Sequence, residues 1–135
     1  MNSPNIVITQ LDADRLDALL ANLSKQQFSG KERLEEELVR ATIVDSRDIP
    51  PDTVTMNSVV IFRTGDGKEF SLKLVYPVDY DGSADKVSIL APIGSALLGL
   101  TEGDSISWPI HGGVTTNVQI IRVAEQPERS GNYAL

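Results

Sequence analysis

A single segment governs the architecture expected for this chain: Val87-Ser88-Ile89-Leu90-Ala91-Pro92-Ile93-Gly94-Ser95-Ala96-Leu97-Leu98-Gly99-Leu100-Thr101-Glu102-Gly103-Asp104. Its first residues have the apolar pattern of a mostly buried strand. Pro92 suits the first position of a helix, where its missing N–H costs nothing, and Gly99 suits the residue just past the helix end. A helix this short is not stable alone. Because its side chains are largely apolar, we expect a sheet to cover it.

Period-two patterning on both sides of this segment predicts that sheet. We expect strands at residues 54–63, 69–76, 86–91, 105–110 and 114–123, with turns at Gly65-Asp66-Gly67 and His111-Gly112-Gly113. Strands in series, interrupted by one short helix, indicate an α+β fold. We therefore predict an antiparallel β-sheet of five strands wrapped on one short helix.

Two amphipathic helices are predicted before the strands begin. Thr9 followed by Asp12 marks the start of the first helix, and Ser29 with Glu32 forms a capping box at the start of the second. Their apolar stripes consist of Leu11, Leu16, Leu19, Leu20 and Leu23 in the first and Leu34, Leu38 and Ala41 in the second. Since the connecting loop is short, the helices are expected to pack antiparallel as a short helical hairpin of the coiled-coil type.

Pro50-Pro51 marks the predicted domain boundary, because consecutive prolines end any helix. We assign residues 1–49 to the helical hairpin and residues 50–135 to the sheet domain. Ile6-Val7-Ile8, ahead of the first helix, is interpreted either as a short edge strand or as an apolar segment leading into the helix.

Composition limits the classes of function. The chain has 135 residues, no cysteine and a net charge of −7, and its basic residues do not cluster. Because DNA binding depends on clustered Lys and Arg, this charge argues against direct DNA binding and favours a basic protein surface as partner. No apolar run is long enough to span a membrane. We expect a cytoplasmic protein with no disulfide, no membrane contact and no cofactor.

The central segment also carries a resemblance. A block of the form Ala/Ser-Pro-Ile-x-x-Ala-Leu-Leu-Gly-x-x-x-Gly-Asp, with a Gly-Gly turn some eight residues later, resembles the C-terminal domain of the bacterial transcript-cleavage factors GreA and GreB. Val54-Thr55-Met56-Asn57-Ser58, Leu74-Val75-Tyr76-Pro77 and the Tyr133-Ala134-Leu135 end look closer still to one branch of that family, named for regulation of nucleoside diphosphate kinase. The resemblance implies a sheet domain similar to the FK506-binding prolyl isomerases, preceded by a helical hairpin.

The resemblance bears on the tip of the predicted hairpin. In the cleavage factors that this chain resembles, acidic residues at the hairpin tip help to position a catalytic magnesium ion inside RNA polymerase. Here the predicted tip contains Lys25, Gln26, Gln27 and Phe28 and no acid. The run Glu35-Glu36-Glu37 lies on the second helix, where consecutive side chains diverge by about 100° and cannot converge on one ion. We expect no transcript cleavage and no enzymatic activity; the tip is either a contact surface or a solvated loop.

The resemblance further implies a docking role for the short helix. In Gre-like proteins the corresponding loop and helix dock on a coiled coil of the largest RNA polymerase subunit, beside the secondary channel. Matched residue by residue, Pro92, Ile93, Ala96 and Leu97 would supply the apolar contact. The alternative is that the leucines are core and that only Pro92 and Ile93 are exposed. Ala91 stands where the family usually has serine, so a side-chain hydrogen bond made by that serine is not available here.

Other sites receive less support. His111, the only histidine, is interpreted as a turn residue, since it has no partners for a catalytic triad or zinc set. The chain has too few aromatic residues to build a prolyl isomerase pocket, and no loop resembles a phosphate-binding loop. We expect a regulator that binds RNA polymerase and competes with or modulates elongation factors. The alternative is an adaptor that regulates nucleoside diphosphate kinase without contacting polymerase.

Overall fold

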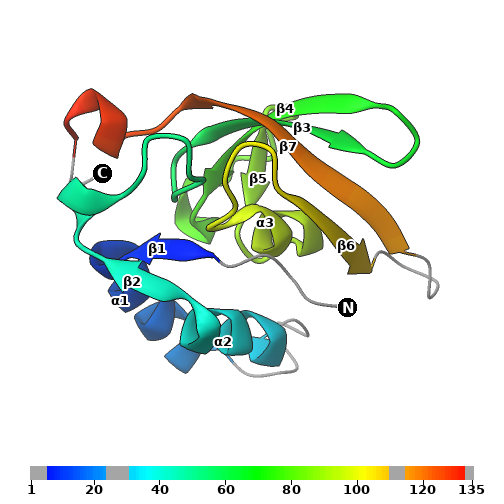
Figure 1. Ribbon diagram of the computed structural model, residues 1–135. Helices are drawn as coiled ribbons and strands as arrows, with labels where there is room; N and C mark the ends of the chain where they lie inside the picture. Colours follow the sequence, from blue (N-terminus) through cyan, green and yellow to red (C-terminus); the bar gives the residue numbers. More distant parts are fainter. Residues whose placement is uncertain (1–5, 24–30, 110–114, 133–135) are drawn as a thin grey trace.

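The computed structural model describes residues 6–23, 31–109 and 115–132. A five-stranded sheet forms one layer, and the N-terminal helices lie on one side of it with a short helix in between (Figure 1). The chain is therefore an α+β protein, as predicted. The hairpin-tip residues Lys25, Gln26, Gln27 and Phe28, the His111 turn and the last three residues lie outside the described residues.

The large sheet has the order β5-β4-β3-β7-β6. Its strands are β3 (Val59–Thr64), β4 (Glu69–Val75), β5 (Lys86–Ser88), β6 (Ser105–Pro109) and β7 (Thr115–Glu125). β3 lies at the centre and pairs antiparallel with β4 and with β7, and β6 pairs antiparallel with β7. The predicted hairpin turn at residues 65–67 joins β3 to β4, with Gly67 at a φ of +86°.

Two features of the sheet differ from the prediction. β5 pairs parallel with β4, so the expectation of a wholly antiparallel sheet was wrong. The chain leaves β4 through a 3-10 turn at Pro77–Asp79 and returns along a loop before β5 begins. The first strand also starts later than expected. Residues 55–58 form a tight turn instead, in which Ser58 N donates to Thr55 O at 3.1 Å and Asn57 has a φ of +69°.

The N-terminal unit consists of β1 (Val7–Thr9), α1 (Gln10–Ala21), α2 (Lys31–Arg40) and β2 (Thr42–Val44). Its capping prediction is confirmed, since the Thr9 hydroxyl accepts a hydrogen bond from Asp12 N at the start of α1. β1 and β2 pair in parallel, a small sheet that the sequence did not predict. Because β1 immediately precedes α1 and β2 immediately follows α2, their pairing brings the start of α1 beside the end of α2. The two helices are therefore antiparallel.

One hydrophobic core joins the N-terminal unit to the sheet. It combines leucines of the predicted helical stripes with apolar residues of the strands: Leu16, Leu20, Leu34, Leu38, Val60, Leu74, Val118 and Ile120. A backbone hydrogen bond reinforces the contact, because Val7 N donates to Gly99 O at 3.2 Å. The boundary at residues 49 and 50 stays a prediction.

Candidate functional sites

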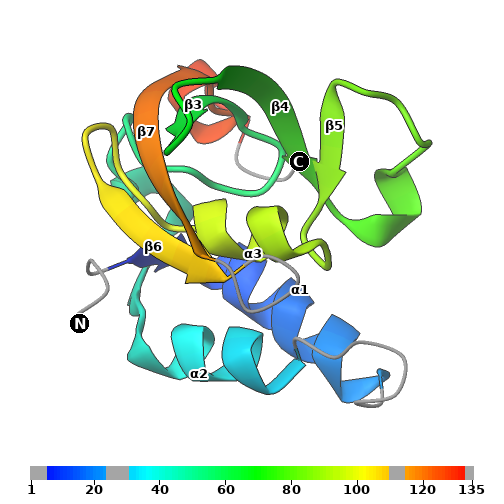
Figure 2. The ribbon, with the colours of Figure 1, turned by 90° about the vertical axis from the view of Figure 1, so that its right-hand side faces the viewer.

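The short helix α3 (Pro92–Leu97) is held against the end of β5 by two serines. Ser95 Oγ donates to Ile89 O at 2.7 Å, and Ser88 Oγ accepts from Leu90 N at 3.1 Å. Ala91 caps the helix without a side-chain hydrogen bond, as its sequence implies. The predicted helix end is also present, since Gly99 has a φ of +82°. Figure 2 shows α3 between the sheet and α1.

Gly94 permits this close packing. A Cβ atom at this position would lie 2.1 Å from Ser88 O, which is a backbone atom and cannot turn away. The sequence analysis treated Gly94 only as part of a short helix, and the contact with residue 88 depends on tertiary structure. This glycine therefore fixes how far α3 stands from β5.

The four residues predicted to contact a partner lie in different environments. Ala96 is 3% exposed and Leu97 is 0% exposed, so both side chains pack in the core. Ile93 is half-buried, and the side chain of Pro92 is not described. Among the described side chains of this helix, only Ile93 and Ser95 are partly exposed, and Ser95 is hydrogen-bonded to Ile89 O. Binding of a partner by any of the four stays a prediction.

Ile93 lies beside a shallow apolar hollow of about 360 Å³ on the sheet. Phe62, Phe70 and Leu72 form its apolar floor. Phe62 and Phe70 are paired across β3 and β4, and their rings stack with centroids 5.4 Å apart. Phe70 is 41% exposed, so part of its ring faces solvent at this hollow. The sequence analysis missed this hollow, although opposed aromatics on both sides of a hairpin turn were a usable signal.

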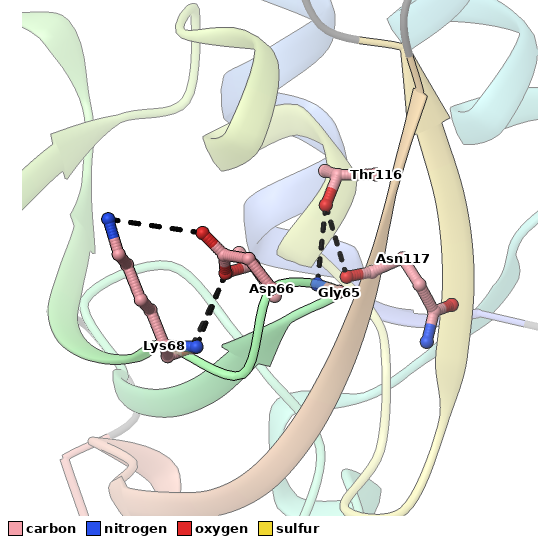
Figure 3. Close-up of polar contacts among 6 residues, drawn as sticks. Gly65, Asp66, Lys68, Thr116 and Asn117 are labelled. Carbon is pink, nitrogen blue, oxygen red and sulfur yellow. Dashed lines mark hydrogen bonds and ion pairs between the residues drawn. The ribbon is translucent and has the colours of Figure 1, made fainter.

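A polar rim at the β3–β4 turn lines one edge of the hollow, and Figure 3 shows the polar contacts of these turn residues. Thr64 Oγ1 donates to the Asp66 carboxylate, and Lys68 N donates to Asp66 Oδ1 at 3.2 Å. The hydrogen bond from Thr64, followed by that from Lys68, lowers the pKa of Asp66 below its usual value. Gly65 N donates to Thr116 Oγ1 at 3.4 Å, which ties the turn to β7. The rim is thus a fixed, charged edge beside an apolar floor.

A buried carboxylate, Asp12, links the N-terminal unit to the sheet. Its side chain is on α1 and is 2% exposed, and it accepts hydrogen bonds from Met56 N at 3.1 Å and from the Tyr76 hydroxyl at 3.2 Å. Burial, reinforced by the nearby Glu128 carboxylate, raises the pKa of Asp12 to about 6 despite these hydrogen bonds. Burial also raises the pKa of Tyr76. The sequence analysis interpreted Asp12 only as a helix-start residue.

Within residues 6–23, 31–109 and 115–132, no three His, Cys, Asp or Glu side chains lie close enough together to hold a metal ion. In the same part of the chain, no helix has the length and apolar character needed to cross a membrane.

The fold and the exposed aromatic hollow define a small α+β protein whose sheet domain presents an apolar surface next to a short helix. The family described as "Transcription elongation factor, GreA/GreB, C-term" matches residues 35–125, and "Rnk N-terminus" matches residues 4–44. The chain belongs to the GreA/GreB family, with the N-terminal region of its Rnk branch.

Individual relatives agree with this assignment. The chain is 42% identical to the "Regulator of nucleoside diphosphate kinase" of Escherichia coli K12, and the match covers 100% of both chains. It is 30% identical to the "Transcription elongation factor GreA" of Syntrophus aciditrophicus over 76% of this chain and 65% of that protein. Among solved structures, "Prokaryotic transcription elongation factor GreA/GreB from Nitrosomonas europaea" has a TM-score of 0.74 and 53% identity, covering 91% of this chain and 100% of the other. The family predicted from the sequence is confirmed.

Proposed function

We propose that this protein is a transcription regulator that binds bacterial RNA polymerase through the hollow beside α3. The observation that carries the proposal is the exposed Phe70 ring next to half-buried Ile93, in the part of the chain that matches the GreA/GreB C-terminal domain. The partner element is the coiled coil of the largest polymerase subunit near the secondary channel, as in the proteins that this chain resembles. Such binding would take place in the bacterial cytoplasm.

The chemistry of the hollow suits a helical partner. An apolar floor with one exposed aromatic ring can accept the apolar face of an amphipathic helix, and aromatic side chains are frequent binding hot spots. Asp66 and Lys68 on the rim can orient the partner by charge. Pro92 and Ile93 would contact the partner directly, whereas Ala96 and Leu97 would act by holding α3 on the core.

The proposed regulator acts without transcript cleavage. The predicted tip between α1 and α2 contains no carboxylate in the sequence, and hard cations such as magnesium require oxygen ligands of that kind. α1 and α2 have only 12 and 10 residues. We infer that the protein competes with the cleavage factors for a shared docking site, or modulates elongation from the channel entrance.

Replacing Ile93 with glutamate is expected to weaken binding to RNA polymerase by at least about tenfold, because a carboxylate would be desolvated against an apolar partner. The fold should survive, since position 93 is in the first turn of α3, where the helix dipole favours a negative charge. The measurement is displacement of labelled GreA from core RNA polymerase by titration. Val39→Glu is the matched control, because Val39 is 87% exposed on α2 and the change adds the same charge.

Displacement by the parent and by the Val39→Glu variant, with failure of the Ile93→Glu variant, would support docking at α3. If the parent protein failed to displace GreA at micromolar concentrations, or if all three proteins displaced it equally, docking at this surface would be wrong. The name of the Escherichia coli relative supports a second candidate, an adaptor acting on nucleoside diphosphate kinase. That candidate predicts a direct effect on purified kinase with no polymerase binding.

A further inference from the structure

A second hollow, of about 300 Å³, lies where α1 meets the ends of β4 and β5. Three basic side chains line it: Arg15 from α1, Lys73 from β4 and Lys86 from β5. Lys73 and Lys86 are paired across the two parallel strands, so their side chains leave the same face of the sheet. Three cations therefore converge on one concave site in a chain whose net charge is −7.

Arg15 and Lys86 each have a partner in the structure, whereas Lys73 has none among the described residues. Among the described residues, Asp79 is the one carboxylate that lines this hollow. Lys86 Nζ lies 3.4 Å from Asp81 Oδ2 on the exposed loop before β5. The guanidinium of Arg15 interacts with the Tyr76 hydroxyl. Within the described residues, the ammonium group of Lys73 makes no hydrogen bond or ion pair. A positive group remains available in the hollow.

Asn57 adds a neutral donor to this site. Its backbone is in the left-handed region, at a φ of +69°, and Asn57 N donates to Leu74 O at 2.6 Å. The side-chain amide lines the hollow and has no hydrogen-bond partner within the described residues. Non-glycine residues in this conformation cost energy and occur often at functional sites.

A third, mainly apolar hollow of about 530 Å³ adjoins the basic one, and the two share Arg15, Tyr76 and Asp79. Leu19, Pro77 and Val78 supply its apolar wall. Val78 is almost fully exposed in the 3-10 turn after β4. The two hollows have the sizes of small-molecule sites, which are about 300–1,000 Å³. A basic compartment thus opens beside an apolar one.

We propose that these adjoining hollows bind a phosphate-bearing small molecule. The phosphoryl group would lie between Lys73, Lys86 and the Asn57 amide, where lysine point charges and an amide N–H provide charge-assisted hydrogen bonds. An apolar or flat ring on the same molecule would lie against Leu19, Pro77 and Val78. The phosphate would replace Asp81 as the partner of Lys86. The site is separate from the surface beside α3 and does not depend on polymerase binding.

The test titrates the full chain with pyrophosphate, adenosine diphosphate and adenosine. Binding is measured by the shifts of backbone amide signals in nuclear magnetic resonance. Pyrophosphate and adenosine diphosphate are expected to shift the signals of Asn57, Lys73 and Lys86 saturably, with adenosine diphosphate binding more tightly because it fills both hollows. Adenosine lacks the phosphate and should bind at least about tenfold more weakly than adenosine diphosphate, since charged hydrogen bonds are lost.

Two variants make the assignment specific. Lys73→Gln is expected to weaken pyrophosphate binding about tenfold, whereas Lys68→Gln, which removes the same charge from the exposed β3–β4 turn, should leave it unchanged. Asn57→Gly removes the amide but keeps the left-handed backbone that glycine favours, so this variant will fold and should bind pyrophosphate several-fold more weakly.

Absence of saturable shifts at millimolar probe, or equal weakening by Lys73→Gln and Lys68→Gln, would overturn the proposal and leave only nonspecific attraction of anions. Equal affinity for pyrophosphate and adenosine diphosphate would overturn the role of the apolar hollow. Binding to vesicles rich in phosphatidylglycerol, with no response to soluble phosphates, would assign the basic hollow to lipid headgroups and would contradict a soluble ligand.

Discussion

Replacing Gly94 with alanine is expected to lower the free energy of unfolding by about 3 kcal/mol, because the added methyl group overpacks a rigid contact. The sign is opposite to that of helix propensity, which favours alanine over glycine inside a helix by about 1 kcal/mol. The clash decides the outcome, since the new Cβ would lie 2.1 Å from Ser88 O. The nearest atoms are all backbone atoms of residues 88 and 89, so no side-chain rotation can relieve it.

Urea denaturation of the parent and of the Gly94→Ala variant measures this effect. Gly65→Ala is the matched control, because a Cβ at Gly65 would find its nearest neighbour at 3.5 Å, an ordinary contact. Its free energy of unfolding should change by less than about 1 kcal/mol, or rise slightly through lower entropy of the unfolded chain. Equal stability of the two variants would show that α3 can move away from β5 at little cost.

The Gly94 contact connects stability with the proposed docking surface. α3 is too short to be stable alone, so its position depends on Ser88, Ser95 and the close approach at residue 94. If alanine displaces the helix, Ile93 moves relative to the hollow that contains Phe70. We therefore expect the part of the Gly94→Ala variant that stays folded to bind polymerase more weakly as well.

Local rules explain which elements the sequence predicted. Pro92 marks the start of α3 and Gly99 lies just past its end, in each case because of the residue's own backbone conformation. The Thr9 cap depends on Asp12, only three positions away. The β3–β4 hairpin is likewise a local element with a short turn. Each of these sequence signals lies within a few residues of the element that it predicts, and each predicted element is observed.

The missed features depend on contacts between distant segments. β1 and β2 have three residues each and pair across more than thirty positions, so neither strand has a hydrophobic period long enough to be recognised. Ala96 lies on an apolar helix whose buried face the sequence could not specify, and its burial follows from where α3 meets the sheet. The basic hollow likewise forms only when α1 lies beside β4 and β5. The Phe62–Phe70 stack is different, because it lies within the local β3–β4 hairpin and its opposed aromatics were a usable signal.

Stability is expected to depend on pH through Asp12. Its carboxyl group has a pKa of about 6 when folded, against 3.8 as the unperturbed value. Between these values the folded protein binds more protons than the unfolded chain, so the free energy of unfolding falls as pH rises. A shift of this size corresponds to a loss of about 2 kcal/mol between pH 4 and pH 7. This is the reverse of the trend given by the exposed carboxyls of Asp66 and Asp81, whose pKa values are lowered.

Asp12→Asn isolates this contribution, since the amide is neutral at every pH. Its oxygen can still accept from Met56 N, and its NH₂ group can donate to the Tyr76 hydroxyl oxygen. The free energy of unfolding of this variant should lack the decrease that Asp12 causes between pH 4 and pH 7. At pH 7 the variant should be more stable than the parent by about 2 kcal/mol, after a small loss of helix-dipole stabilisation. Urea denaturation at pH 4, 5, 6 and 7 measures the difference.

Asp14→Asn is the control for this pH dependence, because it removes the same charge from the exposed face of α1, where Asp14 accepts from Gln10 at 2.8 Å. Its curve should run parallel to that of the parent, since an exposed carboxylate makes only small contributions. If the free energy of unfolding of Asp12→Asn had the same pH dependence as that of the parent, the buried carboxylate would be ionised without cost. The Met56 and Tyr76 hydrogen bonds would then fully offset both burial and the repulsion from Glu128, which would make Asp12 a stabilising link between α1 and the sheet at neutral pH.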